Sequence, residues 1–421
     1  MSSRSIPRAL GAAAAVALAA TMLASCSSSS GDEQIIRVAM GSPGEAQIRV
    51  WEAAGAAFEE ANEGWTVEFN FMEDDQYQTI GLPNLLSSRT PPDVYFEWVG
   101  NRLETRKQDG FTADLNDAVA NGPLAGIFDE DAFASATIDG QISLVPHIAD
   151  VTNVLWYNTE ILAENNVSPP QTWDELLAAC EVLDAAGVTP IASGNKDLWA
   201  AGNWLAHVTS RVVGEEAYDA ALTGTASFDD PKWVEAFGYV QQLADRKCIN
   251  ESINAIDDNE GAQLFFQGKA AMHPIGSWLV SWAIDEAPDL DFDFVNLPEM
   301  PGAGDQSSAI GVVTGYAVNA KGSHVDQAVE FLALLNSPEF VEQFIAAEAV
   351  PITLSAQEST SIDARTARLM ALLSEAGAVI SPPDTGYDLG TADAFYRALA
   401  EVIGGQTSPE DAAAQLASSV G

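Results

Sequence analysis

The order of secondary-structure patterns near the start of the chain constrains the fold most. An apolar strand pattern at residues 35–40 is followed by a helical pattern over 45–62, where apolar residues recur at steps of three and four. A second alternating strand pattern covers 65–71, and a short apolar run at 94–96 is typical of a buried parallel strand. This β-α-β-α-β order predicts an α/β fold with a parallel sheet covered by helices.

The first 25 residues have the pattern of a secretory signal peptide. Arg4 and Arg8 precede an apolar run over 9–23, which is too short to span a bilayer comfortably. The run ends in Leu23-Ala24-Ser25-Cys26, which is similar to a lipobox, the sequence at which a cysteine is lipidated and becomes the first mature residue. An ordinary signal peptide followed by a chance cysteine is the alternative.

A lipid anchor at Cys26 would hold the protein outside the cytoplasm. We expect residues 1–25 to be removed and residues 26–34, the lipidated cysteine and a serine-rich segment, to form a flexible tether. The acyl chains of a lipoprotein meet the requirement of about two chains for stable anchoring. The predicted location is therefore the outer face of the cell membrane, at the cell surface or in the periplasm.

The charge of the chain argues against several partners. There are 61 Asp and Glu against 18 Lys and Arg, which gives a formal net charge of −43. A charge this negative repels nucleic acid and anionic lipid headgroups. It also disfavours an anionic ligand, because no local cluster of arginines offsets it. We therefore expect no nucleic acid partner.

The cysteines and histidines give little sign of metal chemistry. If Cys26 is lipidated, Cys180 and Cys248 remain and could pair outside the cytoplasm. Two separate buried thiols are the alternative, and the spacing alone does not decide. The four histidines are scattered without metal-ligand spacing, so we expect neither a metal site nor a cofactor.

Capping signals mark later helices, and no internal repeat divides the chain. Thr172 with Glu175 predicts a capping box, and Asp230-Pro231 predicts a further helix start. The length of the chain suggests more than one lobe or domain. Because no long linker follows residue 34, we expect the lobes to be joined by several short crossings.

Several segments together resemble the carbohydrate-binding proteins of ABC importers, the maltose-binding type. The most specific are 155–162 (LWYNTEIL) followed by 169–176 (PPQTWDEL). Residues 266–272 (FQGKAAM), followed by 276–278 (GSW), are similar to a second signature of that family. The shared order and spacing of these segments extend the resemblance from about Ile35 to the C-terminus.

The resemblance implies a type II periplasmic-binding fold, in which two α/β lobes clamp a ligand between them. The chain would cross between the lobes three times, near 146–151, 310–314 and 349–352. The boundaries that we expect are 35–147 with 312–348 for the first lobe and 150–310 with 352–421 for the second.

A first candidate site follows the strand that ends at Phe96. Sugars present C–H faces that stack on aromatic rings and hydroxyls that need polar partners. Trp98 could supply the stacking surface, with Glu97 and Asn101 as partners of the hydroxyls, since ligands bind at the carboxyl ends of strands in open α/β sheets. The alternative is that Trp98 packs under a helix while Glu97 is solvated.

A second candidate site is Gly276-Ser277-Trp278. By the resemblance, an aromatic residue that stacks on the ligand stands at Trp278, and Gly276 would let the backbone approach the ligand closely. The alternative is a core tryptophan, because Trp282 follows four residues later and both could line one helix face.

Further residues are assigned to the cleft by resemblance or by topology. Asp150, in the first crossing, is expected to supply a carboxylate to the sugar, and His147 could face the ligand or make a structural hydrogen bond. The remaining candidates are Trp199, Asn203, Tyr387, Asp388, Ser42 and Glu45.

These features predict the extracellular substrate-binding component of an ABC importer. It would capture a mono- or oligosaccharide by hinge closure and deliver it to the membrane permease, as a monomer and not as an enzyme. One alternative keeps the fold and binds a cationic or other small solute such as a polyamine. A secreted glycoside-acting enzyme is another, although the chain has no G-x-S-x-G, H-E-x-x-H or P-loop motif.

Overall fold

The first strands and helices of the computed structural model, which describes residues 34–419, confirm the predicted β-α-β-α-β order. Strand β1 (Ile35–Gly41) pairs in parallel with β2 (Thr66–Met72) and with β3 (Val94–Trp98). Between β1 and β2 the chain forms α1 (Glu45–Ala61), whose buried face includes Trp51. The predicted signal peptide and Cys26 lie outside the described residues.

The sheet of the first lobe is mixed rather than parallel throughout. Its order is β12-β11-β3-β1-β2, with β6 also paired to β11. Strand β11 (Ala309–Val318) is antiparallel both to β3 and to β6 (Val145–Val151), and it is parallel to the short β12 (Val379–Ile380). The prediction of a parallel sheet is therefore right for the first three strands and wrong for β11 and β6.

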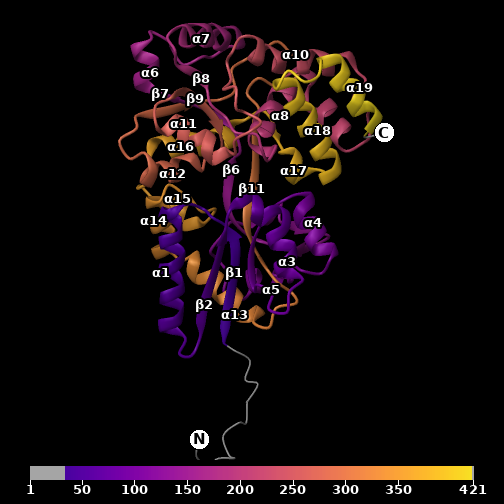
Figure 1. Cartoon of the computed structure of the whole chain (residues 1–421). Coiled ribbons are helices and arrows are strands. Elements are labelled where there is room, and N and C mark those ends of the chain that lie inside the picture. The colour runs from indigo at the N-terminus through magenta and orange to yellow at the C-terminus, as the bar shows by residue number, and fades with distance from the viewer. Residues whose placement is uncertain (1–33, 420–421) are drawn as a thin grey trace, which may run out of the picture. The chain divides into compact units, whose positions relative to one another are not determined.

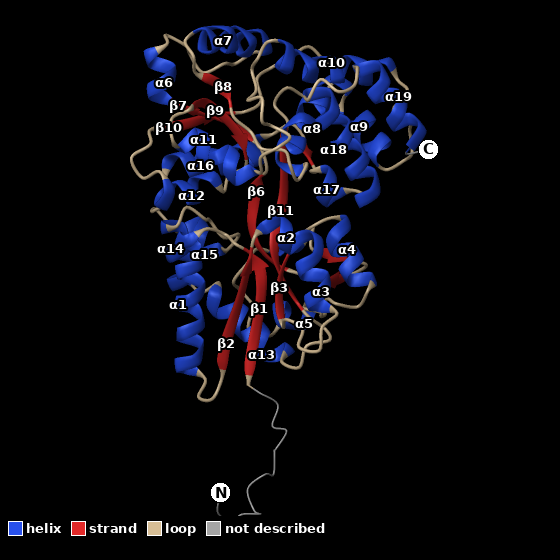
Figure 2. Ribbon diagram, in the orientation of Figure 1, coloured by secondary structure: helices blue, strands red, loops and turns tan. Residues whose placement is uncertain are grey.

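A second sheet lies in the upper half of the structure, apart from β1, β2 and β3 (Figures 1 and 2). Its order is β10-β7-β9-β8. The strands are β7 (Val154–Asn158), β8 (Thr189–Ile191), β9 (Ala270–Ile275) and β10 (Phe292–Val295). We call the elements packed around β1, β2 and β3 the first lobe, and those packed around β7 to β10 the second lobe.

Helices cover both sheets (Figure 2). Those of the first lobe are α1, α2 (Asp74–Gln76), the π-helical turn Tyr77–Gly81, α3 (Leu82–Leu86), α4 (Asn101–Gln108), α5 (Asn116–Ala120), the 3₁₀ turn Glu130–Phe133, α13 (Val325–Leu335), α14 (Pro338–Ala346) and α15 (Leu354–Glu358), together with the hairpin of β4 (Thr137–Ile138) and β5 (Gln141–Ile142).

The second lobe contains more helices than the first. They are α6 (Thr159–Glu164), α7 (Trp173–Ala185), α8 (Trp199–Val213), α9 (Glu215–Leu222), α10 (Pro231–Asp245), α11 (Asp258–Phe266), α12 (Leu279–Glu286), α16 (Ala364–Glu375), α17 (Pro383–Gly386), α18 (Leu389–Ile403) and α19 (Pro409–Ser419). The capping box predicted for Thr172 and Glu175 begins α7, and the Asp230 side chain caps α10. No helix within residues 34–419 is long and apolar enough to cross a membrane.

Strands β6 and β11 run side by side from one lobe to the other (Figure 1). Ile310, near the start of β11, packs in the core of the second lobe, whereas Val318 at its end packs in the core of the first. A third connection follows α14. Helix α15 packs against α14, and the Leu354 amide donates to the carbonyl of Ile127 in the first lobe. The predicted third crossing near 349–352 and the predicted lobe boundaries stay predictions.

The tryptophans divide between the cores and the space between the lobes. Trp51 anchors the core of the first lobe, and Trp204 and Trp233 lie in the core of the second, all fully buried. Burying a large aromatic side chain contributes about 2–3 kcal/mol. These residues therefore stabilise the lobes and are not available to a ligand.

Cys180 on α7 and Cys248, which follows α10, form a disulfide bond, a pairing that the sequence left open. Their Cα atoms are 5.0 Å apart, within the usual range for a bridge, and both side chains are fully buried. The bridge closes a loop with a sequence separation of 68 residues. It therefore restricts the unfolded chain over a long segment.

Removing the bridge is expected to destabilise the second lobe. The double variant Cys180→Ala/Cys248→Ala should lower the free energy of unfolding by about 2–5 kcal/mol, because the unfolded chain regains loop entropy. Urea unfolding followed by circular dichroism measures the loss. Reductant should move the wild-type midpoint toward that of the variant and leave the variant unchanged. Equal wild-type midpoints with and without reductant would contradict the bridge.

Candidate functional site

A cavity of about 580 Å³ lies between the two lobes, and residues of both lobes line it. The first lobe contributes the carboxyl end of β1, where Gly41 is followed by Ser42, and the end of β3. The second lobe contributes parts of α8, α11 and α12. This volume lies in the range of small-molecule sites, and the position agrees with the rule for open α/β sheets.

Three tryptophans of the second lobe form an aromatic wall of this cavity: Trp199, Trp278 and Trp282. The ring centroids of Trp199 and Trp278 are 6.0 Å apart, with their planes tilted by 49°. Each of the three side chains is half-buried, so part of each ring remains accessible. Trp282, which on the core alternative would share a buried helix face with Trp278, lines the cavity as well.

Gly276 has a role other than the predicted one. A Cβ atom at this position would lie 2.0 Å from the Trp278 ring. Gly276 does not line the main cavity; its missing side chain leaves the space that the Trp278 ring occupies. The glycine therefore sets the orientation of the aromatic ring rather than letting the backbone approach a ligand.

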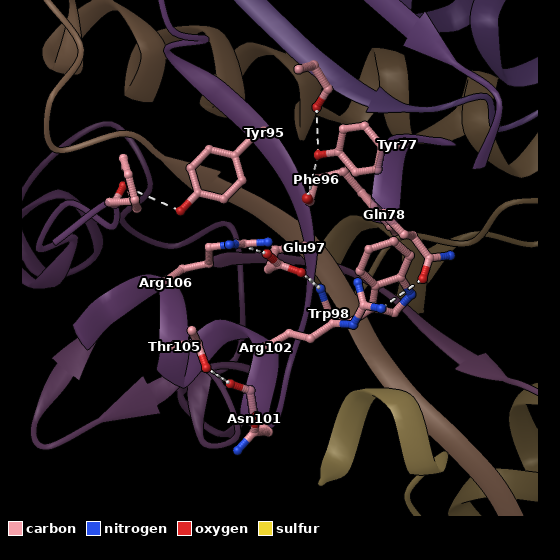
Figure 3. A network of polar contacts seen from close by, with 12 residues as sticks. Tyr77, Gln78, Tyr95, Phe96, Glu97, Trp98, Asn101, Arg102, Thr105 and Arg106 are labelled. Atoms are coloured by element: carbon pink, nitrogen blue, oxygen red, sulfur yellow. Dashed lines mark hydrogen bonds and ion pairs between the residues drawn. The ribbon is translucent and has the colours of Figure 1, made fainter. Parts of the chain in front are cut away.

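Trp98 lines the cavity from the first lobe, opposite the wall formed by the second. The Phe96 ring packs edge-on against it, with centroids 4.7 Å apart, and the Arg102 guanidinium lies 4.9 Å from its centroid (Figure 3). Arg102 also donates to Oε1 of Gln78 at 3.0 Å. These contacts fix the position of the Trp98 ring.

Glu97 does not reach the cavity, so its predicted role as a hydroxyl partner is wrong. Successive side chains of a strand point to opposite faces, and Phe96 and Trp98 take the cavity side of β3. Glu97 is fully buried on the other side and pairs with Nε of Arg106 at 2.8 Å (Figure 3). Its carboxylate also accepts the Trp98 amide at 3.2 Å. Glu97 therefore supports the position of Trp98 from behind.

Asn101 is also outside the cavity. It begins α4, and its carbonyl accepts the Thr105 hydroxyl at 2.9 Å. Its side chain lies away from the Trp98 ring (Figure 3). The prediction failed because the strand ends at Trp98 and α4 begins at Asn101, so Asn101 does not continue the strand.

Asp150 lines the cavity from β6, as expected, and the structure shows what holds it. Oδ1 accepts the Ser277 hydroxyl at 3.0 Å and Oδ2 accepts the Thr314 hydroxyl at 3.1 Å. Burial raises the pKa of Asp150 to about 6, although both hydrogen bonds act in the opposite direction. Ser277 does not line the main cavity and acts through Asp150.

His147, two residues into β6, lines the cavity and is buried. Its ring packs edge-on against Tyr316 and Phe344, with centroid distances of 5.2 and 4.8 Å. Neither ring nitrogen has a hydrogen-bond partner among the described residues. Burial lowers the pKa of His147 to about 3, so the ring is neutral at physiological pH.

The two late candidates lie outside the cavity. The Tyr387 hydroxyl donates to Oδ1 of Asp219 at 3.1 Å, and the ring packs edge-on against Tyr218. The Asp388 side chain caps α18 by accepting the amides of Gly390 and Thr391. The cavity is lined instead by the preceding residues Pro382, Asp384 and Thr385.

Asn203, Ser42 and Glu45 line the cavity, as predicted. Oδ1 of Asn203 accepts the Tyr396 hydroxyl at 2.6 Å, which fixes its orientation. Trp199, Trp98, Trp278 and Asp150 complete the set of predicted residues that the structure brings to this cavity.

Several acidic side chains were missed by the sequence interpretation. Those that line the cavity are Glu73, Asp74, Asp258, Glu286 and Asp384. Glu73 and Asp74 directly follow β2, so the rule on strand ends could have identified them. Asp258 opens α11 behind the capping residue Asp257, a pattern that predicts a helix start but not its position beside the first lobe.

Burial and neighbouring negative charge raise the pKa values of two of these acids. Burial, followed by the charge of Asp74, raises the pKa of Asp258 to about 7. Burial also raises the pKa of Asp74 to about 6, while a hydrogen bond from Gln78 opposes the shift. Such pKa shifts are common at functional sites.

Contacts between the lobes flank the cavity on both sides. On one side Arg49 of α1 pairs with Asp285 of α12 at 3.1 Å. On the other side Arg102 of α4 donates to the Asp384 carbonyl at 3.0 Å. Gly100, with φ of 117°, lies so close to α17 that a Cβ would be 2.6 Å from the Thr385 carbonyl oxygen. The structure therefore shows the lobes in contact around the cavity.

The comparison with known families matches most of the chain. A family model described as bacterial extracellular solute-binding protein matches residues 43–342. An uncharacterized ABC transporter extracellular-binding protein of Pyrococcus horikoshii is 25% identical over 283 residues, 66% of this chain and 63% of that protein. The chain thus spans less than two thirds of that relative. A probable sugar-binding periplasmic protein of Brucella suis is 25% identical over 294 residues, 68% of each chain.

Solved structures confirm the two-lobe α/β fold. A structure from work on xylan utilization by Caldanaerobius polysaccharolyticus has a TM-score of 0.84 at 22% identity and covers 91% of this chain and 99% of its own. A chitin oligosaccharide binding protein has a TM-score of 0.82 at 23% identity and covers 92% and 98%. At these identities the likeness establishes the fold alone.

The perturbed carboxyl of Asp258 predicts a pH-dependent change in stability. Its pKa is about 7 in the folded chain and 3.8 in an unperturbed one, so the folded chain holds more protons between these values and loses stability as the pH rises. Asp258→Asn is expected to raise the free energy of unfolding by roughly 2–4 kcal/mol at pH 8 and by little at pH 4.

Urea unfolding of the ligand-free protein across this pH range measures the effect. Asp289→Asn removes an exposed acid between α12 and β10 and serves as the charge-matched control, with no comparable gain. A stability difference for Asp258→Asn that stays the same from pH 4 to pH 8 would contradict the electrostatic account.

Proposed function

Because the chain belongs to the bacterial extracellular solute-binding proteins, we propose that it captures a sugar between its lobes and delivers it to an ABC importer. The ligand is a mono- or oligosaccharide, and the partner is the membrane permease of the importer. Family membership implies extracellular binding of a solute, and the proposal adds the class of solute and the partner.

The observation that carries the sugar proposal is the composition of the cavity wall. Trp98 of one lobe and Trp199 and Trp278 of the other line the same cavity. Aromatic faces bind the C–H faces of a sugar ring, and Asp150, Asn203 and the other polar side chains can exchange hydrogen bonds with its hydroxyls. The printed name of the Brucella suis relative, a probable sugar-binding periplasmic protein, supports the same ligand class.

Capture by closure of the lobes is supported by the contacts around the cavity. Strands β6 and β11, with the connection that follows α14, join the lobes, and the ion pair of Arg49 with Asp285 forms only when α1 and α12 are close. Closure removes the ligand from water, which strengthens each polar contact. The closed surface of both lobes is then the feature that the permease recognises.

Lipidation of Cys26 and export to the outer face of the cell membrane are part of the proposal, as is a monomeric state. Mass spectrometry of the protein from its native membrane tests the anchor. A diacylated N-terminal peptide that begins at Cys26 is the expected result, and an unmodified N-terminus would contradict it.

Trp278→Ala is expected to weaken sugar binding. The loss of a large stacking surface should cost roughly 1–3 kcal/mol, that is, about a 5- to 150-fold rise in Kd. Isothermal titration calorimetry measures Kd with the sugar that gives the largest thermal shift in a screen of neutral and charged sugars. Trp65→Ala is the matched control, because Trp65 is also half-buried but packs against His324, outside the cavity lining.

Unchanged affinity in Trp278→Ala, or a loss of the same size in Trp65→Ala, would contradict the proposed stacking role. The same samples separate a binding protein from an enzyme. Incubation with candidate oligosaccharides should release no reducing ends, and their release would support the glycoside-acting alternative.

Gly100→Ala is expected to hinder closure. The added Cβ would collide with the Thr385 carbonyl when α4 and α17 meet, so the variant should bind sugar more weakly and retain a larger radius of gyration at saturating sugar. Small-angle X-ray scattering with and without sugar measures this. Gly126→Ala is the control, since Gly126 also has a positive φ, of 75°, but no atom within 4 Å of the added Cβ. Equal compaction of both variants would exclude the contact as part of closure.

A further inference from the structure

The cavity has a strong excess of negative charge. Its lining includes seven carboxyl side chains and, among the described residues, no lysine or arginine. The acids come from both lobes: Glu45, Glu73 and Asp74 from the first, Asp258, Glu286 and Asp384 from the second, and Asp150 from the connecting strand β6. Hydroxyl groups need hydrogen-bond acceptors, but they do not need net charge of one sign.

Asp74 and Asp258 are the two acids that this excess affects most. Asp74 begins α2 of the first lobe, Asp258 begins α11 of the second, and both line the cavity between the lobes. The charge of Asp74 raises the pKa of Asp258, and the charge of Glu73 raises the pKa of both. Asp258 is only 7% exposed. Water therefore screens this repulsion poorly.

The cations near the pair are engaged elsewhere. Arg102 attracts Asp74, but its guanidinium already bonds the Asp384 carbonyl and Gln78 and covers the Trp98 ring. Lys196 pairs with Asp257 at 3.7 Å rather than with Asp258. The protein itself thus leaves the two carboxyls undercompensated.

Other buried polar groups in the same cavity also lack protein partners. Thr152 and His147 line the cavity and are at least nine-tenths buried, and Oγ1 of Thr152 and both ring nitrogens of His147 have no hydrogen-bond partner among the described residues. Buried polar groups are normally hydrogen-bonded. Together with the tryptophans, these groups form a site built for a guest that has both apolar faces and several polar groups.

We propose that the guest is an amino sugar, a sugar that carries a protonated amino group, and that Asp74 and Asp258 hold this group between the lobes. The inference rests on the proposed function and names its ligand class. The ring of the sugar packs on the tryptophan wall, and its ammonium group compensates the two carboxylates.

Energetics favour an ammonium group over a hydroxyl at this position. A hydroxyl donates one hydrogen bond and leaves two neighbouring carboxylates repelling each other in a poorly solvated space. An ammonium group donates up to three hydrogen bonds and removes the repulsion, and hydrogen bonds between charged partners are about twice as strong as neutral ones. Because the acids come from different lobes, the same contact favours the closed arrangement.

The inference predicts a direction for the pH dependence. An ammonium guest binds the ionised carboxylates, so its affinity should fall as the pH drops through about 7 and then about 6, where Asp258 and Asp74 gain protons. The charged groups that face the pair are Glu73, Asp257, Asp384 and Arg102. A neutral sugar should show a smaller change over this range.

The test compares each amino sugar with its neutral parent on the full chain. Calorimetry at pH 7.5 is run with glucosamine and glucose, galactosamine and galactose, and the β-1,4-linked glucosamine dimer and cellobiose. Spermidine and calcium chloride serve as cations without a sugar ring. At least one amino sugar should bind roughly tenfold or more tightly than its neutral parent, and more tightly than either bare cation.

Two variants assign the effect to the proposed contact. Asp74→Asn and Asp258→Asn should each reduce the preference for the amino sugar over its neutral parent to within about threefold. Asp289→Asn, which removes an exposed acid outside the cavity lining, should keep the full preference. Preserved preference in both cavity variants would overturn the assignment.

The outcomes separate this inference from the proposed function. If no amino sugar binds more tightly than its neutral parent, the inference is wrong, and binding of any neutral sugar still supports the sugar-binding proposal. If spermidine or calcium binds and no sugar does, both are wrong.

Discussion

The antiparallel pairing of β6 with β11 is the interaction on which the rest of the structure depends. The two strands belong to both lobes at once. Several of their side chains line the cavity, among them Asp150 on β6 and Thr314 on β11. The register shifts between Thr314 and Gly315, where a Cβ on the glycine would lie 2.2 Å from the Val145 carbonyl oxygen. The hydroxyls of Thr314 and Ser277 both donate to the Asp150 carboxylate. These two hydrogen bonds connect the strand pair to the loop that precedes Trp278. One set of hydrogen bonds therefore joins the strands that connect the lobes to the segment that carries Trp278.

The fold could be predicted in large part, because strand and helix patterns are local. The β-α-β-α-β start and the capping box at Thr172 needed only short segments of sequence. The antiparallel insertion of β11 beside β3 was not predictable in this way, since it joins strands far apart in the chain. The position of α15 with the first lobe depended likewise on a distant contact, that of Leu354 with Ile127.

Cavity residues were predicted correctly where a single sequence signal identifies them. They were missed where their position depends on contacts between segments far apart in the chain. Trp98 and Trp278 follow from the strand-end rule and from the resemblance, and both line the cavity. Glu97 was assigned wrongly because sequence neighbours in a strand point in opposite directions, and that rule was available. The presence of Asp74 and Asp258 in one cavity depends on the approach of the two lobes, which no local pattern encodes. An acidic chain has many carboxyls, so their clustering became informative only once the cavity was defined.

The account as a whole claims that one guest contacts both lobes at once, with its ring on the tryptophans of one and its polar groups shared between both. A crystal structure of the complex, with the sugar that gives the largest thermal shift, tests this claim most directly. The account predicts a sugar ring within van der Waals contact of Trp278, with polar atoms bonded to residues of the first lobe as well. A sugar bound outside this cavity, or one that contacts a single lobe while α1 and α12 stay apart, would contradict it.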